Sequence, residues 1–118
     1  MELIEQLAEA AISQDHLRLR SLAQDLFQSK IQISSLPTPQ TNDLRLRVVS
    51  ASIAELLAIR QGQQPPAWTK EIGALSEPFY LLKSAASMKR LRELCEKQSP
   101  EPMRKRNLYA PPHFLEFA

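Results

Sequence analysis

The apolar residues of this chain recur every three or four positions over most of its length, which is the spacing of one face of an α-helix. Two such stripes near the N-terminus predict two helices, or one bent helix, because nothing at 13–15 forbids continuation. Ser13 or Asp15 can cap the second helix, since either side chain can accept a hydrogen bond from a free amide at a helix start. The stripes consist of Leu3, Ile4, Leu7, Ala8, Ala11 and Ile12, and of Leu19, Leu22, Ala23, Leu26 and Phe27.

A break follows at 34–43, where two prolines and several Ser, Thr and Asn residues favour turns. Thr41 or Asn42 is then expected to cap a long helix over 43–61, and Gly62 to end it. Glu55 falls beside the apolar face of this helix and is expected to be solvated. That face consists of Leu44, Val48, Val49, Ile53, Leu56 and Leu57.

Prolines divide the second half of the chain into shorter segments. Pro65 and Pro66 suit an extended link into a short helix over 67–72, in which Trp68 is expected to anchor the core. Further short helices are expected at 78–86, with Phe79 inward, at 88–98, with Ser87 as a cap, and from Pro100 through Arg106.

These patterns predict an all-α fold in a single domain over 1–118. Residues 1–62 supply three long helices that suit an antiparallel bundle, and residues 63–118 supply several shorter helices, bounded by prolines, that cap the bundle. The chain has two glycines and few β-branched runs, and both facts argue against a sheet with tight hairpins.

The composition, 43% hydrophobic and 24% charged over 118 residues, is that of a globular protein able to bury one core. The single cysteine, Cys95, fits a reducing compartment. No apolar run approaches the roughly 18 residues that span a bilayer. Glutamates near the N-terminus are unlike a secretory signal. We therefore expect a cytoplasmic protein without membrane contact.

Residues that could carry catalysis or hold a metal are sparse. His16, His113 and Cys95 lie far apart in the sequence and lack the spacing of a metal site. Cys95 falls on the apolar stripe of its helix, where a thiol acts as a small hydrophobic side chain. Neither a nucleophile elbow nor a glycine-rich phosphate loop occurs. We therefore expect no enzymatic activity, no metal and no cofactor.

The net charge of +2 conceals a basic segment, since 83–107 carries eight Lys or Arg and three Glu. Such a segment could neutralise nucleic-acid phosphates, and the helices expected at 78–86 and 88–98 have roughly the rhythm of a helix-turn-helix. Their joint lacks a glycine, and Glu93 and Glu96 lie on the second helix, so a solvated amphipathic helix is favoured. The candidate nucleic-acid contacts are Lys89, Arg90, Arg92, Arg104, Lys105 and Arg106, of which the last three are expected to face water.

The C-terminal sequence NLYAPPHFLEFA, at 107–118, is unusually apolar for a chain end. Such residues must be buried, either on their own domain or on another chain, and Pro111 and Pro112 stiffen the segment. A small-molecule pocket between the two halves, lined by Trp68 and Tyr109, is a third alternative. The candidate contacts with a protein partner or a second copy of the chain are Trp68, Phe79, Tyr109, Phe114, Leu115 and Phe117.

The segments PPAWTKEIGALSEPFYLL and MKRLRELCEKQSPEPMRKRNLYAPPHFLEFA, within 65–118, resemble the second half of small, mostly uncharacterised bacterial proteins. Those proteins share a Trp-Thr-x-Glu-x-Gly segment and an Arg-rich tail that ends in Asn-Leu-Tyr-x-Pro-Pro-x-Phe-Leu. Some are encoded beside toxin–antitoxin-like or nucleotidyltransferase-like genes, so the resemblance implies an antitoxin-like or regulatory subunit and supplies no catalytic residues. We therefore expect a non-catalytic protein that acts by protein–protein interaction, with nucleic-acid binding as the alternative.

Overall fold

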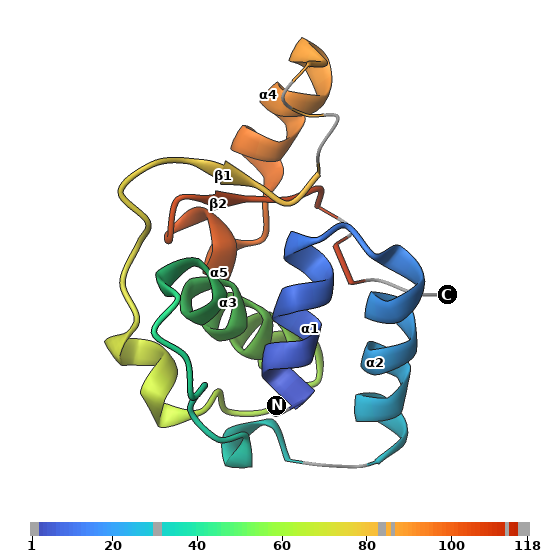
Figure 1. The fold of residues 1–118 in the computed structure, drawn as a ribbon, viewed down its shortest axis with the longest axis vertical. Coiled ribbons are helices and arrows are strands. Elements are labelled where there is room, and N and C mark those ends of the chain that lie inside the picture. Colours follow the sequence, from blue (N-terminus) through green and yellow to red (C-terminus); the bar gives the residue numbers. More distant parts are fainter. Residues whose placement is uncertain (1–2, 30–31, 83–84, 86, 113, 116–118) are drawn as a thin grey trace.

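The computed structural model describes residues 3–29, 32–82, 85, 87–112 and 114–115. Helices dominate it, which confirms the predicted all-α class, and a short parallel pair of strands is added to them (Figure 1). The antiparallel order of the long helices stays a prediction. Along the chain the elements are α1 (Leu3–Ile12), α2 (His16–Gln28), the 3-10 helix η1 (Ile33–Ser35), α3 (Leu44–Arg60), the 3-10 helix η2 (Ala67–Glu71), β1 (Phe79–Tyr80), α4 (Lys89–Gln98), α5 (Glu101–Arg104) and β2 (Leu108–Tyr109).

The hydrophobic core forms around α3 and α1, and α1 lies between α3 and α2 (Figure 1). Every residue from Val48 to Ala58 is buried, so this stretch of α3 is covered on all sides rather than on one face. Ile4 and Leu7 of α1 belong to the same cluster, together with Met103 and Leu108 from the second half. One core therefore joins residues from both halves of the chain.

Aspartate side chains cap the N-termini of two helices. The carboxylate of Asp15 accepts a hydrogen bond from an amide in the first turn of α2 at 3.2 Å, which confirms two separate helices. Asp43 caps α3 in the same way, since its carboxylate accepts from the amide of Leu46 at 3.3 Å. The expected cap at Thr41 or Asn42 is wrong, because the hydroxyl of Thr41 accepts from the amide of Asp43 itself at 3.1 Å.

Gly62 follows the C-terminus of α3, as predicted. Its φ is +64°, and its amide donates to the carbonyl of Ile59 at 3.3 Å, while the amide of Gln63 donates to the carbonyl of Ala58 at 2.8 Å. This pair of bonds is the Schellman motif, which needs a residue with positive φ at the position of Gly62.

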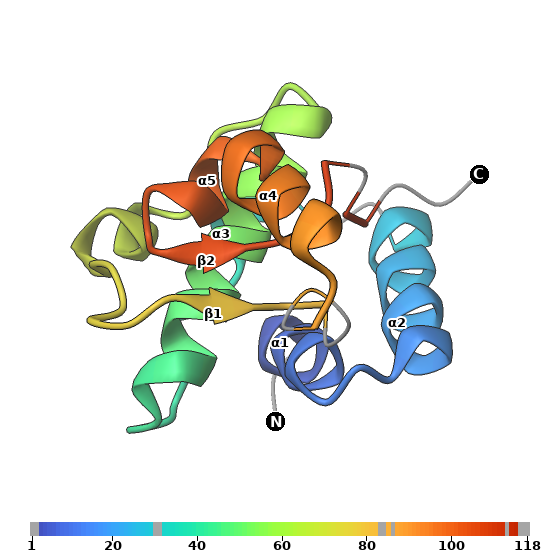
Figure 2. The same cartoon turned by 90° about the horizontal axis from the view of Figure 1, so that it is seen from above.

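The helix expected at 78–86 is wrong, because Phe79 and Tyr80 form β1. This strand pairs in parallel with β2, and the two strands lie side by side (Figure 2). The amide of Phe79 donates to the carbonyl of Asn107 at 3.1 Å, and the amide of Leu81 donates to the carbonyl of Tyr109 at 2.8 Å. The partner strand arrives from the C-terminal segment, so tertiary pairing overrides the local helical spacing.

The other short helices agree with the sequence more closely. The 3-10 helix η2 confirms the helix expected over 67–72, and α4 confirms the one expected over 88–98. The N-cap of α4 is Met88 and not Ser87. The turn that begins after Pro100 ends earlier than expected, since α5 stops at Arg104.

The described residues of the C-terminal segment pack against their own domain. Leu108 and Leu115 are buried, and Phe114 packs against the core. The guanidinium of Arg60, at the end of α3, donates to the carbonyl of Phe114. Phe117 lies outside the described residues. None of the helices in the described part of the chain has the length and apolar character that crossing a bilayer requires.

Candidate functional site

A buried ion pair joins Glu55 in α3 to Arg106, two residues after the end of α5. The guanidinium of Arg106 donates through Nη1 to Oε1 of Glu55, and their side chains are 3% and 10% exposed. The expectation that Glu55 is solvated is wrong, because Glu55 as a whole residue is 8% exposed within the covered stretch of α3. The expectation that Arg106 faces water is also wrong, because its side chain points inward to reach this carboxylate.

Arg106 also bonds to three backbone carbonyls. Its Nε donates to Ile72 at 3.2 Å, its Nη1 to Pro102 at 2.9 Å and its Nη2 to Thr69 at 2.8 Å. Its own carbonyl accepts from the amide of Leu75 at 2.9 Å. The Arg106 side chain therefore links η2 and Ile72, the residue after it, to α3 and α5. Four of its five N–H donors are used.

Lys105 approaches the same carboxylate from the surface. Its Nζ lies 3.0 Å from Oε1 of Glu55, and its side chain is 48% exposed. Burial by itself raises the pKa of Glu55, but the hydrogen bonds from Arg106 and Lys105, with the charges of both, outweigh burial and hold this pKa below its ordinary value. Glu55 is therefore an anion in the folded protein at neutral pH.

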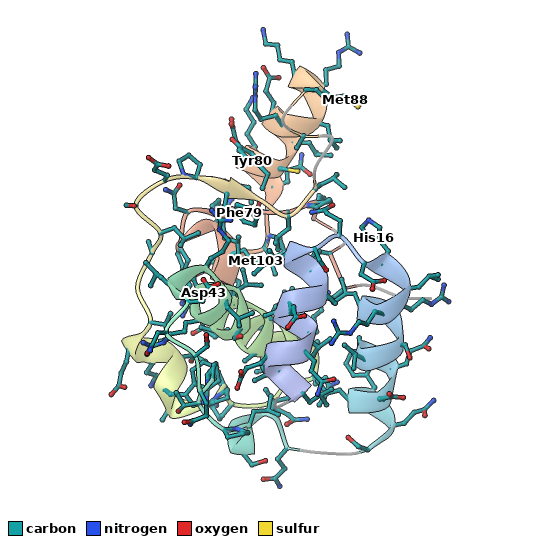
Figure 3. All side chains as sticks on the ribbon, viewed as in Figure 1. His16, Asp43, Phe79, Tyr80, Met88 and Met103 are labelled. Carbon is teal, nitrogen blue, oxygen red and sulfur yellow. The ribbon has the colours of Figure 1, made fainter. Side chains whose placement is uncertain are left out.

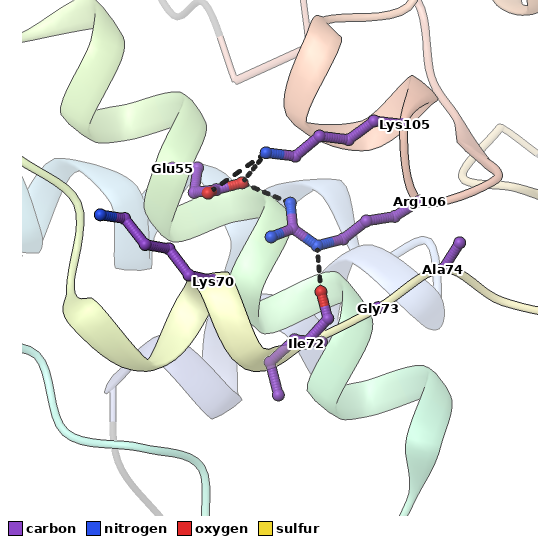
Figure 4. A pocket seen from close by; sticks show the side chains of 7 residues that line it. All are labelled: Glu55, Lys70, Ile72, Gly73, Ala74, Lys105 and Arg106. Atoms are coloured by element: carbon purple, nitrogen blue, oxygen red, sulfur yellow. Dashed lines mark hydrogen bonds and ion pairs between the residues drawn. The ribbon is translucent and has the colours of Figure 1, made fainter.

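An open pocket of about 290 Å³ lies beside this ion pair (Figure 4). Lys105 and Arg106 reach it from the end of α5, Glu55 from α3, and Lys70 from η2. Lys70 is exposed and has no ion pair or hydrogen bond with any residue that the structure describes. The lining residues are Glu55, Lys70, Ile72, Gly73, Ala74, Lys105 and Arg106.

A second surface feature is α4, which projects from the body of the molecule (Figure 1). Met88 lies near its outer end, 55% exposed (Figure 3). Lys89 and Arg90 are exposed, Arg92 is half-buried, and Cys95 is buried. Burial raises the pKa of the Cys95 thiol, so it stays protonated, as the sequence predicts for a small hydrophobic side chain.

The base of α4 is held by polar contacts to β1 and to the segment after β2. The hydroxyl of Tyr80 donates to Oε1 of Glu96 at 2.5 Å, and the Tyr80 and Tyr109 rings lie 5.4 Å apart. The hydroxyl of Ser99 accepts from the amide of Ala110 at 2.9 Å. These bonds anchor one end of α4 and leave its outer end clear of the body.

The candidate nucleic-acid contacts do not form one patch. Lys89, Arg90 and Arg92 lie on α4, and Arg104 is exposed near its base, where Nη1 donates to the carbonyl of Lys97 at 2.9 Å. Lys105 and Arg106 instead turn toward Glu55. The helix-turn-helix interpretation is wrong, because β1 occupies the position of its first helix.

The candidate partner contacts are likewise spread over the molecule. Trp68 is half-buried and its Nε1 donates to the carbonyl of Leu36 at 2.8 Å. Phe79 lies under the guanidinium of Arg45, whose Cζ is 4.2 Å from the ring centroid. Leu115 is 5% exposed. The 290 Å³ pocket is lined by neither Trp68 nor Tyr109, so the two do not share this site.

Glu55 and Lys70 are not predicted from the sequence to belong to one site. A signal for Glu55 was available, because it is the single charged residue in the run from Val48 to Ala58. A charge inside such a run needs a buried partner. Nothing in the sequence marks Lys70, whose place beside Glu55 depends on the route of the chain after α3.

The described residues include no group of three or more His, Cys, Asp or Glu side chains placed to hold a metal ion. Comparison with family models, with curated proteins and with solved structures returns no match for this chain.

Proposed function

We propose that this protein is a non-catalytic binding protein and that α4 is the surface on which an acidic segment of a partner protein docks. The observation that supports it is the exposure of α4, which projects from the body and buries Cys95 alone among its ten residues (Figure 1). An isolated helix of this length is marginal in water. A partner that covers α4 would complete its packing.

The spacing of residues along α4 suits a docking face. Arg90, Leu94 and Lys97 are neighbours by the i+4 and i+3 rule, so Leu94 is flanked by two cations. Leu91 and Leu94 are half-buried, while Arg90 and Lys97 are exposed. An apolar position framed by cations fits a partner segment that carries an apolar residue between carboxylates.

The charge of α4 specifies the sign of the partner. The helix carries four Lys or Arg and two Glu, which leaves +2. Opposite charge accelerates encounter and makes affinity depend on salt. We propose in addition that the protein is a regulatory or antitoxin-like subunit in the cytoplasm. The resemblance to bacterial proteins, some of which are encoded near toxin–antitoxin-like genes, supports this.

The proposed contact surface on α4 does not include most of the partner contacts that the sequence predicts. Leu115 is buried in the core, and Trp68 is half-buried with its indole N–H bonded to Leu36. Tyr109 remains relevant, because its ring lies against Tyr80 at the base of α4. A partner that docks on α4 would therefore lie closer to Tyr109 than to the buried residues of the core.

Products of the flanking genes are the first partners to test, by calorimetric titration of each purified protein into this one. We expect a complex whose affinity falls with salt, and the double variant Arg90→Gln with Lys97→Gln should weaken it by about tenfold or more. The matched control is Gln24→Glu with Gln28→Glu on the exposed side of α2, which changes net charge by the same two units. Equal affinities for the two double variants would refute α4 as the contact.

Nucleic-acid binding is the second candidate, since Lys89 and Arg90 are exposed at the outer end of α4 and Arg104 is exposed at its base. It predicts a gel shift with a mixed duplex at low salt that disappears steeply as salt rises. The same Arg90→Gln with Lys97→Gln variant should reduce that shift. A shift of this kind, with no complex between the chain and a protein partner, would replace the first proposal.

A further inference from the structure

The pocket beside the Glu55–Arg106 ion pair carries an excess of positive charge. Lys70, Lys105 and Arg106 contribute +3 and Glu55 contributes −1, which leaves +2 around about 290 Å³. As whole residues, Arg106 and Glu55 are 2% and 8% exposed, so water screens their charges less than those of the exposed lysines. An anion with two charges would balance the pocket.

The cations of the pocket that a ligand can reach are the two lysines, of which Lys105 is already paired with Glu55. Arg106 spends four of its five donors on Glu55 and three carbonyls, so its planar fork cannot grip a carboxylate in the bidentate manner. Lys70 has no partner among the described residues, and Lys105 is 48% exposed. Lysine ammonium groups bind phosphate as point charges, and two of them match a phosphate dianion in charge.

The rim of the pocket adds backbone donors. Gly73 and Ala74 line it, and their amides make no hydrogen bond with any residue that the structure describes. A Cβ built on Gly73 would meet nothing within 4 Å, so a ligand can approach this part of the backbone closely. Backbone N–H groups next to lysines are common partners of phosphate oxygens.

We propose that this pocket binds a small phosphate dianion, either inorganic phosphate or the phosphoryl group of a small phosphate monoester, between Lys70 and Lys105 with the amides of Gly73 and Ala74. A monoester has a second pKa of about 6, so it carries close to two negative charges at neutral pH. The buried Glu55–Arg106 pair holds Lys105 at one side of the ligand, and η2 presents Lys70 at the other (Figure 4).

The test is a titration of the full chain with inorganic phosphate, followed by the amide NMR signals of its two glycines at constant ionic strength. Gly73 lines the pocket, whereas Gly62 does not and serves as the internal reference. We expect the amide signal of Gly73 to shift and saturate as phosphate is added, and the amide signal of Gly62 to show no saturable shift. A parallel titration with glycerol phosphate distinguishes the two sources, because tighter binding of the monoester points to an organic ligand and equal binding to the free ion.

Charge variants decide whether the lysines hold the ligand. Lys70→Ala and Lys105→Gln should each raise the dissociation constant by about tenfold or more. Lys89→Ala on α4 removes one positive charge outside the pocket and should leave the dissociation constant unchanged. Lys70 is exposed, so its replacement keeps the fold, and the spectrum of the variant verifies this. Equal affinity in Lys70→Ala and Lys89→Ala, or parallel shifts of Gly73 and Gly62, would overturn the proposal.

Discussion

Arg106 reaches from the end of α5 into the core and bonds to Glu55 in the middle of α3. A buried ion pair of this kind gains little stability over an apolar pair of the same volume, because both charges lose their hydration. Its value here is positional, since the same guanidinium holds the carbonyls of Thr69, Ile72 and Pro102. The Arg106 side chain therefore helps to hold the path of the chain after η2, together with the backbone bond from Leu75 to the Arg106 carbonyl.

Replacement of Arg106 by Met should destabilise the fold strongly. The change leaves Glu55 with Lys105 as its remaining cation and deprives the bonded carbonyls of a donor. We expect a loss of about 3 kcal/mol in the free energy of unfolding, measured by urea denaturation. Arg104→Met, at an exposed neighbouring position, should cost less than about 1 kcal/mol. Similar losses for the two variants would contradict the structural role of Arg106.

The ion pair also predicts how stability depends on pH. The pKa of Glu55 is lower in the folded than in the unfolded protein, so its stabilising effect is present above its ordinary pKa of about 4.3. It is lost as the pH falls through the folded-state value. The difference in unfolding free energy between the wild type and Glu55→Gln should therefore narrow as the pH falls below about 4. A difference that stays constant over this range would argue against the ion pair.

The long helices could be predicted from the sequence because their apolar spacing is a local property. The stripe that ends at Ile12, the cap at Asp15 and the stop at Gly62 each depend on residues within a turn or two. The site could not be predicted in this way. Arg106 and Glu55 are brought together by the packing of α5 on α3, and their spacing along the chain carries no periodic signal.

The error at β1 has the same origin. Phe79 and Leu82 fall at helical spacing, and the sequence alone gave no reason to prefer a strand. The amides of Phe79 and Leu81 are bonded to carbonyls of Asn107 and Tyr109, which lie far along the chain. A two-residue strand gains its stability from that partner and not from its own residues.

Leu115 provides a test of how the C-terminal segment is buried. Its side chain is 5% exposed within its own domain, so Leu115→Ala should lower the free energy of unfolding by about 2 kcal/mol without changing the oligomeric state. Urea denaturation and light scattering measure the two quantities. Leu17→Ala is the matched control, because Leu17 is 84% exposed and its loss should matter by less than about 0.5 kcal/mol. Dissociation of an oligomer in Leu115→Ala would show burial on another chain instead.

Tyr80 should titrate late at alkaline pH. The hydrogen bond to Glu96 raises the pKa of Tyr80 to about 12. Because the folded-state pKa is the higher one, the contribution of this bond to stability is complete below about pH 10 and is lost as the pH rises further. Tyrosinate absorbance should therefore contain a late component that Tyr80→Phe removes and that Glu96→Gln moves to lower pH. Persistence of the late component in Tyr80→Phe would contradict its assignment to Tyr80.

The two glycines should respond in opposite directions to the same substitution. Gly62 has a φ of +64° in the Schellman motif after α3, where an alanine is strained although nothing lies within 4 Å of its Cβ. Gly62→Ala should therefore cost about 1 kcal/mol in the free energy of unfolding. Gly73 also has open space around it and does not have a positive φ, so Gly73→Ala should stabilise by about 0.4–1 kcal/mol through the unfolded chain. Each variant is the control for the other in urea denaturation, since both add one methyl group at an exposed position. A loss of equal size in both would show that the backbone angle of Gly62 does not determine the response.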